Sequence, residues 1–196
     1  MNQNNHRFSL GCAWGDFNND GWPDLCVAND FGKKNLYRNN GNGTFTDIAE
    51  EAGVRNVGPG MSACWLDYDN DERPDLYVAI MWEAPGLRVT MQDNFMKNAP
   101  PEIRAYLRNH AMGNALFHNE GNGKFLEQSL KAGVDDGRWS WSSTAFDFDH
   151  DGCLNLYIPN GFISQPSQKD IESFFWRQVV SKSPLDARAT RDYEQG

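Results

Sequence analysis

"GDFNNDGWPDLCVAND", residues 15–30, is the stretch that decides the fold. It carries four oxygen-bearing side chains within nine positions and then continues directly into an apolar segment; these side chains are Asp16, Asn18, Asp20 and Asp24. Carboxylates held this close repel one another, whereas a hard cation placed among them would reverse the sign of the interaction. The spacing therefore predicts a cation-binding loop followed by a strand.

The stretch occurs three times in the chain. It returns as "LDYDNDERPDLYVAI" (66–80) and "FDFDHDGCLNLYIPN" (146–160), while "NLYRNNGNGTFTDIAEEAGV" (35–54) returns as "NALFHNEGNGKFLEQSLKAGV" (114–134). We treat 1–196 as a single unit of about two and a half repeats. Repeat one covers 8–54, repeat two covers 55–134 with an insertion at 81–112, and the incomplete repeat three covers 139–196 with an insertion at 162–196.

Each repeat reads as β-structure. "FSLGCAW" places Phe8, Leu10, Cys12 and Trp14 on one face of a strand, a period of two. Further short strands are expected at 25–28, 35–38 and 45–48, the last two joined by an Asn-Gly turn. Trp14 and Trp65 occupy matching positions, so both are expected in the core. Four short antiparallel strands in about 50 residues are typical of a propeller blade.

The predicted fold class is therefore all-β, a partial β-propeller of four-stranded antiparallel blades with short helical insertions. Residues 100–110 open with prolines in a position that the first turn of a helix tolerates. Residues 169–180 carry apolar side chains at helical spacing. Both segments are expected to be helices. The helix at 169–180 is expected to pack on the blade edge, with a partner-binding helix as the alternative.

The acidic loops follow the pattern D-x-[DN]-x-D-x-x-x-[DN], and the main-chain carbonyl at position 7 would complete a shell of oxygens. Such a set suits calcium, which accepts six to eight hard ligands. About three Ca²⁺ ions are predicted, and an EF-hand is excluded because its position 12 falls on Val27, Val78 or Ile158 inside a strand. The predicted ligands are Asp16, Asn18, Asp20, Trp22 and Asp24; Asp67, Asp69, Asp71, Arg73 and Asp75; and Asp147, Asp149, Asp151, Cys153 and Asn155.

Glu72 distinguishes the second loop, because Gly21 and Gly152 stand at the same position in the other two. If position 6 requires a left-handed backbone, the glutamate carries a steric cost there. The second loop also has four carboxylates where the other loops have three. These two effects on cation affinity oppose each other.

Net charge, apolar run length and the absence of catalytic motifs exclude several classes of partner and function. The net charge of −9 argues against nucleic acid or an anionic membrane as partner, and no apolar run approaches the ~20 residues that span a bilayer. The histidines show no metal-ligand spacing, and no nucleophile elbow or phosphate-binding loop occurs, so an enzyme is not expected. Cys12 and Cys26 flank one turn, which leaves open a disulfide or two free thiols.

The acidic loops and the segment 35–54 resemble the FG-GAP/VCBS repeat family, most closely the bacterial cartilage-acidic-protein-like (ASPIC/UnbV) proteins. The resemblance covers most of residues 8–160 and implies a β-propeller of about seven blades with calcium in its loops. It also implies an extracellular, periplasmic or cell-surface location and a role in adhesion or in carbohydrate or protein binding. The Gly-Ala-Pro element that names the repeat does not occur in this sequence.

Two and a half blades do not close a ring. Either the chain continues in a longer protein or several copies complete the ring together. The function predicted is a calcium-binding scaffold for binding or adhesion. The alternatives are a lectin-like propeller, in which Trp22 or Trp82 stacks on a sugar, and part of a polysaccharide-active hydrolase or lyase.

Overall fold

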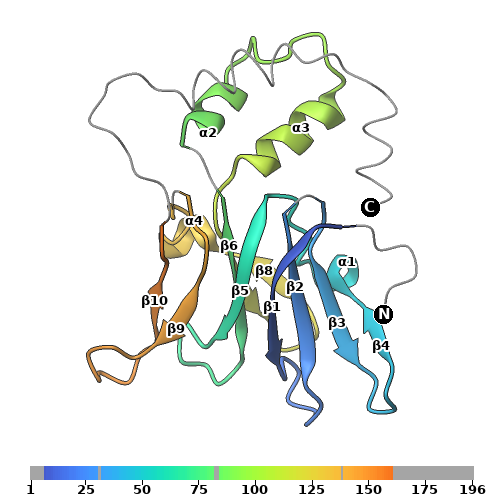
Figure 1. Cartoon of the computed structure of the whole chain (residues 1–196), viewed down its shortest axis with the longest axis vertical. Helices are drawn as coiled ribbons and strands as arrows, with labels where there is room; N and C mark the ends of the chain where they lie inside the picture. The colour runs from blue at the N-terminus through green and yellow to red at the C-terminus, as the bar shows by residue number, and fades with distance from the viewer. Residues whose placement is uncertain (1–6, 31, 82–83, 138, 161–196) are drawn as a thin grey trace.

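The computed structural model describes residues 7–30, 32–81, 84–137 and 139–160. These residues form three antiparallel sheets that stand side by side, with a helical segment at one end (Figure 1). The segment 169–180, the insertion at 162–196 and Trp82 lie outside the described residues. No helix in the described ranges is long and apolar enough to cross a membrane.

The first sheet is a meander of four strands, β1 (Ser9–Gly15), β2 (Asp24–Asn29), β3 (Asn35–Asn39) and β4 (Phe45–Asp47). Trp14 pairs with Leu25, and Leu25 pairs with Tyr37, which places these three side chains on one face. A single helical turn, α1 (Ala49–Ala52), follows and ends at Gly53, whose φ of 83° is a left-handed cap. The four strands agree with those predicted for repeat one.

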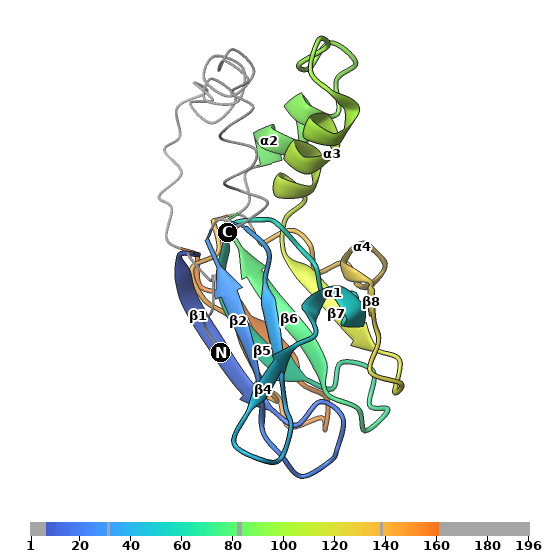
Figure 2. The same cartoon turned by 90° about the vertical axis from the view of Figure 1, so that its right-hand side faces the viewer.

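The second sheet repeats this order with β5 (Gly60–Leu66), β6 (Asp75–Ile80), β7 (Ala115–Asn119) and β8 (Phe125–Glu127), followed by α4 (Ser129–Ala132). Between β6 and β7 the chain forms α2 (Ala84–Thr90) and α3 (Pro101–His110). Helix α3 begins at the proline, as the sequence predicts. Figure 2 shows both helices beyond one end of the sheets, clear of the loops at the other end.

Only two strands of repeat three are described, β9 (Thr144–Phe146) and β10 (Asn155–Tyr157). They form a third, two-stranded sheet, and an isolated bridge joins Ser140 to Asn160 in the same repeat. A second isolated bridge joins Met81, directly after β6, to Trp139 of repeat three. None of the sheets in the described part of the chain closes on itself.

The sheets stack face to face around two apolar clusters. Cys26 and Leu36 of the first sheet share a cluster with Leu76, Val78 and Phe117 of the second. The opposite face of the second sheet forms another cluster with Ala145, Leu156 and Ile158 of repeat three; its own members there are Leu66, Tyr77, Ala79 and Leu116. Because the second sheet is covered on both faces, every residue of β6 is buried.

The prediction that Trp14 lies in the core is wrong. Its side chain is 58% exposed, whereas the matching Trp65 is partly buried and packs on the cluster between the first two sheets. The period of two is correct, but Phe8, Leu10 and Cys12 also lie on the outer face. The inner face of β1 carries Gly15, where a Cβ would stand 2.6 Å from the Trp65 ring.

All four cysteines are free. Cys12 pairs with Val27, and Cys26 pairs with Ala13, so the two thiols lie on opposite faces of the first sheet. Cys12 is exposed, while Cys26 is fully buried in the core. Of the two alternatives for this pair, the structure has the free thiols.

Candidate metal sites

The three acidic loops connect β1 to β2, β5 to β6 and β9 to β10, and they lie at the end of the stack opposite α2 and α3 (Figure 1). A stacking of equivalent sheets places equivalent loops next to one another. Asn70 of the second loop donates to the Cys153 sulfur of the third, at 3.4 Å. The Phe17 carbonyl in the first loop accepts from Asn119 of the second sheet, at 2.8 Å.

The aspartate at position 1 organises each loop in the same way. Its two carboxylate oxygens accept the backbone N–H groups of positions 5 and 6. In loop one, Asp20 and Gly21 donate to Asp16 at 3.0 and 2.7 Å. The equivalent distances to Asp67 are 3.0 and 2.8 Å, and those to Asp147 are 3.1 and 2.9 Å.

The aspartate at position 5 closes the loop. It accepts the backbone N–H of position 7, from Trp22 to Asp20 at 2.8 Å, and the same bond occurs from Arg73 to Asp71 and from Cys153 to Asp151. Three sequences that differ at the intervening positions thus adopt one network. The repetition indicates that the invariant oxygens, and not the variable side chains, determine the loop conformation.

Two positions in each loop have a left-handed backbone. The predicted one is position 6, where φ is 86° at Gly21, 67° at Glu72 and 88° at Gly152. Sequence reasoning missed position 4, where Asn19, Asn70 and His150 have φ between 55° and 60°. Asparagine is enriched in this conformation, so the two asparagines were an available signal.

Position 9 has a second role that its spacing did not reveal. Asp24 and Asp75 are fully buried, and each accepts two backbone N–H groups, one from its own loop and one from the next hairpin. In repeat three the Asn155 amide oxygen accepts from Phe148 at 3.3 Å. Position 9 therefore fastens each loop to its sheet.

Burial raises the pKa of Asp24 and Asp75, and the backbone hydrogen bonds only partly offset it. Neighbouring loop carboxylates raise the pKa further. Because the pKa of each carboxyl is higher in the folded chain than its ordinary value of 3.8, the carboxyl destabilises the fold as the pH rises above that value. At neutral pH both groups therefore favour a cation nearby.

The loops differ in how closely their carboxylates gather. Asp67, Asp69 and Asp75 form one group whose oxygens lie within 4.8 Å, and the aspartates of loop three form another, Asp147, Asp149 and Asp151. In loop one Asn18 replaces the second carboxylate, and its amide donates to Asp20 at 2.8 Å. The main-chain carbonyls of Trp22, Arg73 and Cys153 stay predicted ligands.

The second loop has a histidine that the sequence analysis did not assign. His118 of β7 lies with Asp69 and Asp71 in a further group of ligand atoms within 4.8 Å. Its Nδ1 is 3.1 Å from Asp75 Oδ1. Arg38 occupies the matching position of repeat one. The distance of His118 from the loop in sequence concealed this contact.

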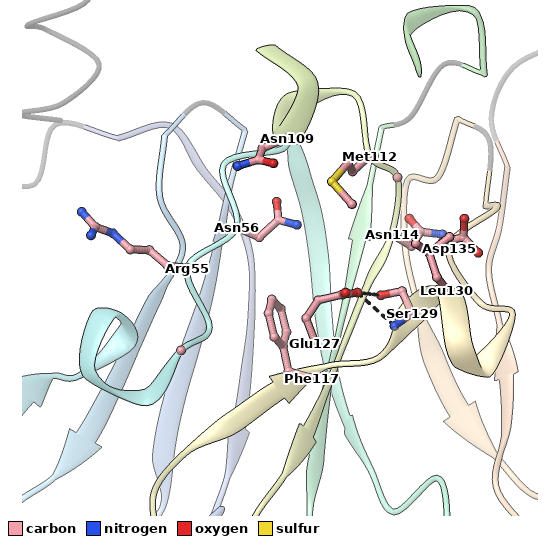
Figure 3. A pocket seen from close by; sticks show the side chains of 12 residues that line it. Arg55, Asn56, Asn109, Met112, Asn114, Phe117, Glu127, Ser129, Leu130 and Asp135 are labelled. Carbon is pink, nitrogen blue, oxygen red and sulfur yellow. Dashed lines mark hydrogen bonds between the residues drawn. The ribbon is translucent and has the colours of Figure 1, made fainter. Parts of the chain in front are cut away.

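A cleft of about 180 Å³ lies between α1, α3 and α4. Figure 3 shows that Arg55, Asn56 and Asn109 line one side, while Asn114 and Asp135 lie across from them. Glu127 accepts the Ser129 N–H at 2.9 Å on its wall. The lining combines these amides and charged groups with the apolar side chains of Met112, Phe117 and Leu130.

Residues 16–78 match a family model described as an FG-GAP-like repeat. The match begins at the first aspartate of loop one and ends within β6. It therefore includes the first two acidic loops and the strands β2 to β5, but not β1. It supports the FG-GAP/VCBS repeat family, whose members are typically extracellular or surface β-propeller modules. No curated protein matches the chain significantly.

Proposed function

We propose that the chain is a calcium-stabilised binding module whose three sheets are consecutive blades of a β-propeller. The observation that carries the proposal is the shared loop network, in which the donors described for position 1 are uncharged backbone N–H groups of the loop itself, so the negative charge of that position stays uncompensated. The carboxylates of each loop would together hold one calcium ion. The ligands would be the side-chain oxygens at positions 1, 3, 5 and 9 and the carbonyl at position 7.

The stacking of the sheets supports the blade assignment. Trp65 faces the first sheet, so the matching Trp14 faces the position of a preceding blade. At the other end, Tyr77 is fully buried by the third sheet, whereas the matching Tyr157 is 59% exposed. Further blades, from a longer chain or from other copies, would cover both faces and complete a ring.

The module is proposed to act outside the cytoplasm, at the cell surface or in the periplasm or extracellular space. Loops of modest calcium affinity fill where calcium is millimolar and stand largely empty in a resting cytosol. In this role calcium fixes the loop geometry, and recognition of a protein or carbohydrate uses the loop surface without turnover.

Calcium removal tests this proposal. A ligand present at 100 times its Kd stabilises the fold by about 2.7 kcal/mol per site, so EDTA should lower the Tm by several degrees, and calorimetry should give about three calcium ions per chain. Magnesium at the same concentration is the control, because it prefers water to an all-protein shell. Identical melting curves with calcium and with EDTA would refute the proposal.

A carbohydrate-binding module is the second candidate, and a specific observation favours it. Trp22 projects from the first loop with 51% of its surface exposed, next to the Asn-Gly turn at Gly41. Exposed tryptophan faces stack on sugar rings. Glycan-array binding that is lost in Trp22→Ala, with an unchanged calcium-dependent melt, would select this candidate over a protein-binding scaffold.

A further inference from the structure

The second acidic loop has a nitrogen donor. His118 belongs to β7, more than forty residues after the loop, and its side chain is only 11% exposed. Both ring nitrogens face carboxylates. Repeat one has Arg38 and Asn40 where repeat two has His118 and Glu120, so the described part of the first repeat contains no equivalent arrangement.

Hydrogen bonding assigns the two ring nitrogens. Nδ1 is 3.1 Å from Asp75 Oδ1, an oxygen that also accepts the Asn119 N–H at 2.8 Å. A carboxylate oxygen only accepts, so Nδ1 is the donor in this pair. A buried carboxylate that holds one imidazole nitrogen in this way orients the other nitrogen toward a metal in many metal sites.

Nε2 then points at oxygens that it does not bond. It lies 4.0 Å from Asp71 Oδ2 and 3.9 Å from Glu120 Oε1, too far for a hydrogen bond. Zinc ligands bonded at about 2.0–2.2 Å stand roughly 3.4 Å apart in a tetrahedron. The ligand atoms of His118, Asp69 and Asp71 already lie within 4.8 Å of one another, so small shifts of the two acidic side chains would bring the three around one ion. Arg73 also pairs with Asp71 Oδ2, and the ion would share that oxygen with the guanidinium or displace it.

We propose that repeat two binds a transition divalent cation of the zinc type through His118, Asp69 and Asp71, whose ligand atoms lie within 4.8 Å of one another, with Glu120 as a further oxygen donor. Calcium prefers oxygen ligands alone, whereas zinc accepts imidazole together with carboxylates. The ion would fasten the end of β7 to the acidic loop. The inference rests on the proposed function only in that Asp69 and Asp71 also belong to the proposed calcium set.

Zinc titration of the full chain, with calcium in excess, tests the site. Wild type is expected to bind one zinc ion that His118→Gln weakens by about 10–100-fold. The control is His150→Asn, which alters an exposed histidine in loop three to the residue of the other two loops. X-ray absorption at the zinc edge should show one imidazole nitrogen in wild type.

Melting curves without metal check that the variants fold, and His118→Arg, which introduces the repeat-one residue, is the second variant. Equal zinc affinity in wild type and both His118 variants, or an all-oxygen shell, would overturn the inference while three intact calcium sites upheld the proposed function. A zinc site that depends on His118, in a chain that binds no calcium, would uphold the zinc inference and refute the proposed calcium-dependent function.

Discussion

Single residues in the acidic loops carry conformations that their side chains disfavour. Glu72 has a φ of 67° where the other loops have glycine, and its N–H donates to Asp67 at 2.8 Å, which fixes that backbone. A side chain in the left-handed region costs about 1–2 kcal/mol, which the greater freedom of glycine in the unfolded chain partly offsets.

Glu72→Gly should therefore raise the free energy of unfolding by about 0.5–1 kcal/mol in EDTA, measured by urea denaturation. Glu72→Gln is the control, because it removes the charge and keeps the Cβ. If the glutamine variant gains as much as the glycine variant, charge repulsion and not backbone strain is the cause.

Lys34 is a buried cation outside the loops. Its side chain is 1% exposed, and Nζ donates to the carbonyls of Asn29, at 3.1 Å, and Gly58. Burial lowers the pKa of Lys34 to about 7, against the opposing influence of the Cys26 thiol and the Asp30 carboxyl, while Arg7 lowers it further.

The lowered pKa of Lys34 predicts a pH dependence. Above pH 7 the unfolded chain keeps the lysine proton that the folded chain releases, so stability rises with pH until the ordinary pKa of 10.5 is passed. Between pH 7 and 8.5 the gain is up to about 1.4 kcal/mol per pH unit. Urea denaturation across this range should show the gain in wild type and a flatter profile in Lys34→Met. Parallel profiles would contradict the lowered pKa.

At the scale of the secondary-structure elements, hydrogen bonds within and between repeats hold the end of β7 to the first two acidic loops. Asn119, at the end of β7, donates to the carbonyls of Phe17 in loop one, at 2.8 Å, and Pro74 in loop two, at 3.0 Å. Its backbone N–H donates to Asp75. The bonds described for the matching Asn39 stay within repeat one: its amide donates to the Pro23 carbonyl and accepts the Gly41 N–H, and its own N–H donates to Asp24. Asn119 therefore joins two neighbouring loops.

Asn119→Ala should lower the free energy of unfolding by about 2–3 kcal/mol, because it leaves the buried Phe17 carbonyl and the partly buried Pro74 carbonyl without this donor. Asn39→Ala, the matched control, should cost about 1 kcal/mol, since its bond to Pro23 is exposed. Calorimetry should also show weaker calcium binding at loop one in Asn119→Ala. Equal losses in the two variants would mean that the bond between repeats contributes nothing beyond the local turn.

The strands and loops could be predicted because their causes are local. Alternation, Asn-Gly turns and the acidic spacing each act within a few residues, and the strands of repeats one and two occur where these signals stand. The face that a strand buries is decided elsewhere. Leu10 and Trp14 have the alternation of a core strand, yet they lie on the outer face because no sheet of the described chain covers them. His118 escaped prediction for the same reason, since the fold brings it to the loop.

At the scale of the whole molecule, the described chain is a stack with two uncovered ends. The outer face of the first sheet exposes Leu10 and Trp14, and that of the third exposes Phe146 and Tyr157. The corresponding faces of the second sheet are covered. Inside the stack, one face of a sheet packs on the opposite face of the next sheet, and this contact occurs twice. The two uncovered outer faces are the two sides of the same kind of contact, which joins units head to tail.

Trp14 and Trp65 occupy the same position in two repeats, but in the described chain a neighbouring sheet packs on Trp65 alone. The loss of stability on substituting each one therefore measures how much that packing contributes. Trp65 contacts Phe17 and Phe125, with ring centroids at 6.2 and 6.3 Å, and donates to the Ala13 carbonyl at 3.3 Å. Trp14 has an edge contact with Phe45 at 6.1 Å. Trp65→Ala should cost about 3–5 kcal/mol, the range for a large aromatic in a core, whereas Trp14→Ala should cost below about 1 kcal/mol in this chain.

Urea denaturation of the two variants at low protein concentration gives the two stability losses. The same experiment at high protein concentration tests whether a second copy packs on the outer face of the first sheet. If a second copy seats on the outer face of the first sheet, wild-type stability rises with protein concentration and Trp14→Ala removes that rise. If further blades of a longer chain supply the cover, the 196-residue chain shows no concentration dependence, and Trp14→Ala becomes as costly as Trp65→Ala once those blades are present. A large cost of Trp14→Ala in the dilute chain would mean that the outer face is already packed, and the assignment of the sheets as blades of an open stack would be wrong.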